Sequence, residues 1–178
     1  PSSGYWKIQE STLRESTEHT RIISHLIHIG KKGGLLTYVG RREQPEICED
    51  GRRLRDLADL KTLDVLRDKY DVRSLERLAM VDVLWLSNSG EIECIIEVEN
   101  STGFVSAIAR GSNAGSKIPK IMVIPESRET ELKNILDPQF KESFLSETWK
   151  YITYGSVSRL KNFSRPTVSE IIKVAQKL

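Results

Sequence analysis

Residues 81–99 read VDVLWLSNSGEIECIIEVE, which is two apolar segments joined by a short polar one. Residues 81–86 are rich in side chains that favour strands, and the Asn-Ser-Gly sequence at 88–90 is typical of a turn. Residues 91–99 then form the returning strand. The stretch therefore predicts a β-hairpin, which has acidic residues inside its otherwise apolar strands.

Helices and strands alternate on both sides of this hairpin. Apolar periodicity and helix or strand breakers predict further strands at 35–40, 118–124 and 149–154, and helices at 17–32, 102–110, 126–136 and 165–178. Ser101 is expected to cap the helix that follows the hairpin. The charged segment 41–55 is interpreted as an exposed loop, followed by one or two short helices. The predicted fold class is α/β (α+β), with a mixed central β-sheet flanked by helices.

Composition restricts the classes of protein. The chain has 178 residues, with 27 Lys+Arg against 25 Asp+Glu and only two cysteines. We expect a single domain, 1–178, with its core at about 17–155, and neither a membrane span, a disulfide framework nor a structural zinc. The near-zero net charge excludes an arm that coats nucleic acid, so any nucleic-acid site is local. Without a signal sequence, a cytoplasmic (intracellular) location is expected.

Three carboxylates stand in the hairpin where burial makes them costly. Asp82 lies between two valines, while Glu97 and Glu99 flank Val98. Strand side chains alternate faces, so Glu97 and Glu99 share a face, and the hairpin brings Asp82 beside Glu97. Such a cluster favours a hard cation, Mg²⁺ or Mn²⁺. The alternative is that all three face solvent, with Asp82 capping the strand edge.

These motifs are similar to those of a known superfamily. Asp82 on one hairpin strand, Glu97-Val98-Glu99 on the next, and the helices and strands around them resemble the PD-(D/E)XK superfamily of restriction-endonuclease-like proteins. The resemblance implies a Mg²⁺-dependent deoxyribonuclease. It implies Asp82 and Glu97 as metal ligands, with the Val98 carbonyl completing the shell. Glu99 stands where most members have Lys, and could bind a second metal or orient the attacking water.

Further candidates lie outside the hairpin. Many superfamily members carry a carboxylate on the first core helix, which would be Glu18 here. Its alternative role is to complement the helix dipole, and His19 is the other residue of that helix that could face the site. Arg110, at the end of the next helix, is a candidate DNA contact or a helix C-terminal cation. Arg41 and Arg42 are candidate phosphate contacts, or solvated charges.

The expected function is a restriction- or repair-type DNA endonuclease. A catalytically inactive DNA-binding or assembly module of the same fold is the main alternative, because Glu99 replaces the usual Lys. A nucleotide- or RNA-processing enzyme is a third interpretation, since carboxylates alone do not specify DNA. Cleavage of both strands generally needs two active sites, so the resemblance also implies a homodimer. The chain is also compatible with the C-terminal part of a longer protein that carries an N-terminal specificity domain.

Overall fold

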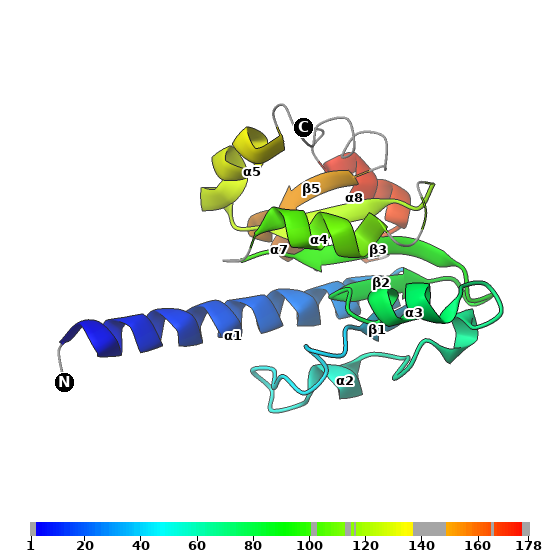
Figure 1. Ribbon diagram of the computed structural model, residues 1–178, viewed down its shortest axis with the longest axis horizontal. Coiled ribbons are helices and arrows are strands. Elements are labelled where there is room, and N and C mark those ends of the chain that lie inside the picture. The colour runs from blue at the N-terminus through cyan, green and yellow to red at the C-terminus, as the bar shows by residue number, and fades with distance from the viewer. Residues whose placement is uncertain are drawn as a thin grey trace.

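The fold is built on a five-stranded mixed sheet (Figure 1). The computed structural model describes residues 3–100, 103–112, 115, 117–136, 149–164 and 166–175, those at 3–16 and 135–136 by their backbone alone. The strands follow chain order across the sheet and are β1 (Leu36–Val39), β2 (Val83–Leu86), β3 (Ile92–Val98), β4 (Lys120–Ile124) and β5 (Trp149–Thr153). The pairs β1–β2 and β2–β3 are antiparallel, whereas β3–β4 and β4–β5 are parallel.

Helices cover both faces of the sheet (Figure 1). The described helices are α1 (Ser3–Lys32), α2 (Leu54–Leu57), α3 (Val72–Leu78), α4 (Phe104–Gly111), α5 (Glu129–Leu136), α7 (Tyr154–Leu160) and α8 (Val168–Val174), with 3₁₀ turns η1 (Asp64–Leu66) and η3 (Glu126–Arg128). Apolar side chains of α1, α7 and α8 pack on the face that includes Val83, Ile96 and Val98. Segments η1 and α3 pack on the opposite face near Leu84, and α4 packs there near Met122.

Helix α1 lies close against the sheet because the helix has a glycine, Gly30, on the side that faces β2. The indole Nε1 of Trp85 donates a hydrogen bond to the Leu26 carbonyl at 3.2 Å, and Trp85 is fully buried. A Cβ at Gly30 would lie 2.5 Å from that same Nε1, so a larger residue there would force the helix away from β2. This close packing fixes the position of the helix that also carries His19.

The predicted mixed sheet, with all five strands, is confirmed, but several boundaries were wrong. Helix α1 begins at Ser3 rather than near residue 17, and α4 begins at Phe104 with Gly103 at its N-cap. Ser101, the expected cap, lies outside the described residues. Helix α3 was not predicted: Val72, Leu75 and Leu78 recur at helical spacing, but only Leu78 among them is fully buried. The C-terminal helix ends at Val174, before the expected 178.

The segment 41–55 is only partly an exposed loop. Cys48 and Leu54 are buried, and Leu54 donates its backbone N–H to the Glu46 carbonyl at 2.9 Å. Charged residues are frequent along this segment and conceal the two apolar anchors that hold it on the core. The segment therefore has a fixed position beside the end of β1.

Asp59 joins α1, β1 and the segment after α2, so its loss should destabilise the fold. Its carboxylate accepts hydrogen bonds from the Thr37 N–H (3.0 Å) and hydroxyl (2.8 Å), and pairs with Lys31 at 3.1 Å. We expect Asp59→Ala to lower the free energy of unfolding by about 1–2 kcal/mol at pH 7, because Thr37 is buried and would lose its acceptor. Chemical denaturation, with the exposed Asp68→Ala as control, checks this.

The same contact sets a pH dependence. Burial would raise the pKa of Asp59, but the Thr37 hydrogen bonds and the Lys31 ammonium hold it below its ordinary value of 3.8. Because the pKa of Asp59 is lower in the folded protein, its contribution to stability is complete above pH 3.8. That contribution is lost as the pH falls through the folded-state pKa. The stability difference between parent and Asp59→Ala should therefore shrink at the acid end. A constant difference down to acid pH would contradict this assignment.

Candidate active site

Asp82 lies immediately before β2, in a buried position. The strand begins at Val83 rather than at 81, and the pairing of Val83 with Ile96 places Asp82 across from Glu97. The Asp82 side chain accepts a hydrogen bond from the Val98 N–H at 2.7 Å, and the residue is only 5% exposed. Burial raises the pKa of Asp82 from 3.8 to about 6. The carboxylate is therefore held firmly but poorly solvated.

Glu97 and Glu99 share one face of the chain, as the strand alternation predicts. Both are buried, while Val98 between them joins the apolar core on the α1 side. Glu99 follows the end of β3 and donates its backbone N–H to the Val123 carbonyl at 2.9 Å, which continues the pairing with β4. Burial, and then the charge of Asp82, raise the pKa of Glu97 well above its usual range. The hairpin thus concentrates negative charge in a region that water reaches poorly.

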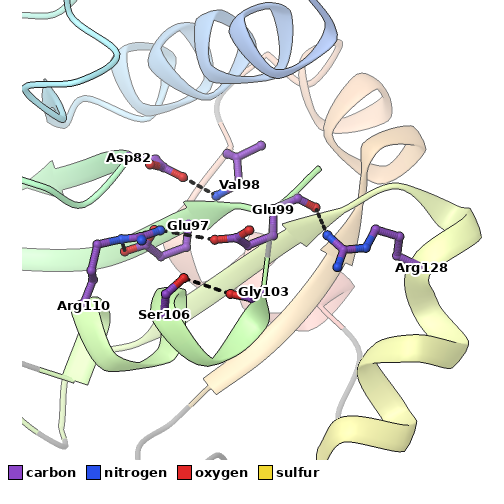
Figure 2. Close-up of polar contacts among 8 residues, drawn as sticks. All are labelled: Asp82, Glu97, Val98, Glu99, Gly103, Ser106, Arg110 and Arg128. Carbon is purple, nitrogen blue, oxygen red and sulfur yellow. Dashed lines mark hydrogen bonds and ion pairs between the residues drawn. The ribbon is translucent and has the colours of Figure 1, made fainter. Parts of the chain in front are cut away.

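Arg110, in the last turn of α4, binds both glutamates (Figure 2). Its Nε lies 3.1 Å from each carboxylate oxygen of Glu97, and its Nη2 lies 2.6 Å from Glu97 Oε2. The same Nη2 donates to Glu99 Oε1 at 3.2 Å. Arg110 therefore supplies positive charge to both carboxylates from a neighbouring helix.

A second group of side chains surrounds Asp82. Ligand atoms of His19, Glu43 and Asp82 all lie within 4.8 Å of one another. His19 comes from α1, and Glu43 comes from the turn after β1, where its N–H donates to the Gly40 carbonyl at 3.1 Å. A Cβ at Gly40 would lie 2.7 Å from Glu43 Oε2, so the glycine leaves room for this carboxylate. The turn therefore directs Glu43 toward Asp82.

The chemistry of this group suits a hard cation. Burial, and next the charge of Asp82, raise the pKa of Glu43 to about 8, and burial lowers the pKa of His19. Glu43 Oε2 is buried and has no hydrogen-bond partner among the described residues. The two carboxylates of Glu43 and Asp82 match the oxygen ligands that Mg²⁺ and Mn²⁺ prefer, whereas the imidazole of His19 is a ligand more typical of transition metals. The residues present therefore fit a divalent ion.

Sequence reasoning missed Glu43. It lies in the charged segment 41–55, where nothing in the composition separates a half-buried acid from its exposed neighbours. One signal was available: Gly40 ends a strand, and an acid follows three residues later. A glycine at that place allows a short turn that brings the next side chains back to the sheet. His19 was named only as an alternative to Glu18, and it is the one that joins Asp82.

The remaining candidates lie at the surface. Glu18 is exposed and pairs with Arg21 at 3.2 Å, so its place in the site stays a prediction. Arg41 and Arg42 are exposed. The charge of Arg42 acts to lower the pKa of both Asp82 and Glu43, which places it on the same side of the molecule as the carboxylates. Contacts of these arginines with DNA also stay predictions.

Comparison with known proteins identifies a family. The family model for the C-terminal domain of the type II restriction enzyme NmeDI matches residues 4–175. No match was found among curated proteins or among solved structures. In the described part of the chain, no helix is both long and apolar enough to cross a membrane. Because the match spans almost all of the sequence, the chain belongs to the family of the type II restriction enzyme NmeDI C-terminal domain.

Proposed function

We propose that this domain is the metal-dependent nuclease part of a restriction enzyme, which hydrolyses phosphodiester bonds in DNA. The observation that carries the proposal is the buried cluster of Asp82, Glu97 and Glu99. It occurs in a chain that belongs to a family of restriction-enzyme domains. Buried carboxylates without enough counter-charge destabilise a fold, so their presence together is best explained by a cation that they bind.

Each residue has a proposed role. Asp82 and Glu97 hold the metal, with the Val98 carbonyl completing the shell, and Glu43 and His19 extend the ligand set around Asp82. When bound, Mg²⁺ or Mn²⁺ lowers the pKa of a water and stabilises the charge that develops on the phosphate. Glu99 orients the attacking water or holds a second ion. The Val98 N–H fixes the Asp82 carboxylate, so this ligand needs little reorganisation.

DNA is the proposed partner. Arg41, Arg42 and Arg110 are the proposed phosphate contacts, since guanidinium groups bind phosphate oxygens in a bidentate manner. Cleavage of both strands would require two copies, which supports a homodimer as the active form. The family name describes a C-terminal domain. We accordingly propose that sequence specificity resides in another part of a longer chain.

One observation favours a second function. Glu99 is an acid where most members of the superfamily that the sequence resembles have a lysine, and Arg110 already pairs with both Glu97 and Glu99. A permanently paired site would bind no metal, and the domain would then serve DNA binding or assembly without cleavage. The two functions differ in their dependence on divalent ions.

A cleavage assay separates them. Purified protein is incubated with plasmid, branched and single-stranded DNA, and with RNA, each with Mg²⁺, with Mn²⁺ or with excess chelator. A nuclease should cut at least one DNA form with metal and none with chelator. Binding of DNA without cleavage in any condition would favour the inactive module, whereas cleavage of RNA alone would identify a ribonuclease.

A further inference from the structure

Arg110 lies at the outer side of the buried carboxylates. Its side chain is 25% exposed, whereas the side chains of Glu97 and Glu99 are 0% and 2% exposed. Arg110 is thus the most exposed member of this group of charges, and Figure 2 shows it beside both carboxylates.

The guanidinium and a divalent cation need the same oxygen atoms. Both carboxylate oxygens of Glu97 accept hydrogen bonds from Arg110, and Oε1 of Glu99 accepts another. A guanidinium only a few ångströms away would also repel the second cation where water screens little. Binding of Arg110 and binding of a metal at Glu97 therefore oppose each other.

We propose that Arg110 is a displaceable counter-ion of this site. In the metal-free protein it pairs with Glu97 and Glu99; when a divalent cation takes these carboxylates, Arg110 turns to a phosphate group of bound DNA. The second half rests on the proposed function. Arg110 can make this change because it lies in the last turn of α4 and part of its side chain already contacts solvent.

This arrangement couples the two ligands. The protein would bind metal weakly alone, because Arg110 competes for Glu97. DNA would draw the guanidinium away and so strengthen metal binding, and metal would strengthen DNA binding by the same factor. The metal site would thus be filled mainly when the metal ion and DNA are both present. Without DNA, little of the protein would carry the ion.

The first test uses Mn²⁺ alone, without DNA. Calorimetric titration and thermal unfolding compare the parent with Arg110→Gln, Arg110→Lys and the exposed control Arg67→Gln. Arg110→Gln should have a lower midpoint without metal, but should bind Mn²⁺ about tenfold tighter or more, because one nearby positive charge is removed. Arg110→Lys should bind about threefold tighter, since an ammonium cannot hold the carboxylate in a bidentate manner. Arg67→Gln should match the parent.

The outcomes are decisive without any cleavage. Mn²⁺ binding that is no tighter in Arg110→Gln than in the parent would overturn the proposal and leave Arg110 as a static structural pair. If Arg110→Gln fails to fold, Arg110→Lys replaces it: Mn²⁺ binding no tighter than in the parent would overturn the proposal. A protein that cleaves nothing would refute the proposed nuclease function, but the change in Mn²⁺ affinity would still support the counter-ion.

The second test addresses the transfer to DNA. Fluorescence anisotropy measures binding of a short phosphorothioate duplex, which resists cleavage, with and without Mn²⁺. The parent should bind this duplex more tightly with Mn²⁺, and Arg110→Gln should lose most of that enhancement. An equal enhancement in both proteins would show that Arg110 does not pass to the phosphate.

Discussion

Asp82→Asn should reduce DNA cleavage about 10³-fold while leaving the fold intact, because a lost metal contribution of several kcal/mol corresponds to that factor. The amide oxygen can still accept the hydrogen bond that the Val98 N–H donates to Asp82 at 2.7 Å. What disappears is the negative charge that binds the cation. Plasmid cleavage under single-turnover conditions measures the effect, with Asp68→Asn as a surface control.

Stability provides an independent readout of the same variant. Burial raises the pKa of Asp82 from 3.8 to about 6. Ionisation of Asp82 therefore costs more in the folded protein than in the unfolded chain, and it opposes folding. A raised folded-state pKa for an acid means that this cost is absent at pH below 3.8 and is complete above about 6. Asp82→Asn should therefore be more stable than the parent at pH 8 in chelator, and the difference should vanish at low pH. A less stable variant at pH 8 would contradict the assigned burial cost.

Glu99→Gln should also abolish most cleavage, by about 10²-fold or more, if this carboxylate orients water or holds a second ion. DNA binding should change little, because the amide keeps the shape and can still accept from Arg110 Nη2, which lies 3.2 Å from Glu99 Oε1. Parallel cleavage and anisotropy measurements separate the two effects. Parent-like cleavage by Glu99→Gln would exclude a role for the charge.

The converse substitution, Glu99→Lys, distinguishes one metal from two. It introduces the lysine that is usual in the superfamily that this sequence resembles, and it removes a carboxylate. A site that uses one ion should retain measurable cleavage, whereas a site that needs Glu99 for a second ion should not. The nearby Arg110 makes a second positive charge costly in this buried position, so the unfolding midpoint must be measured alongside.

The sheet could be predicted because its strands carry their own signals. Apolar β-favouring runs end at glycine, proline or polar turns, and the Asn-Ser-Gly turn fixed the hairpin of β2 and β3. Helix α3 gives a weaker signal, because its apolar spacing at Val72, Leu75 and Leu78 spans only two turns. Its one buried residue, Leu78, makes the helix depend on tertiary packing, while its N-cap is a local hydrogen bond from the Ser74 N–H to Asp71.

The candidate site likewise has features that the sequence could predict and features that it could not. Strand alternation correctly placed Glu97 and Glu99 on one face and Val98 in the core, because that geometry is local. Contacts between distant segments are not local. Neither the approach of Glu43 to Asp82 nor the pairing of Arg110 with the glutamates leaves a periodic trace in the sequence. Both depend on how a turn and a helix end meet the sheet.

The most direct test of this account is calorimetric titration of the protein with Mn²⁺. The parent should bind the ion, and the double variant Asp82→Ala, Glu97→Ala should not. A matched control, Glu91→Ala with Glu93→Ala, removes two less buried acids from the same hairpin and should bind as the parent does. Undiminished Mn²⁺ binding by the Asp82, Glu97 double variant would place the metal elsewhere and contradict the central claim.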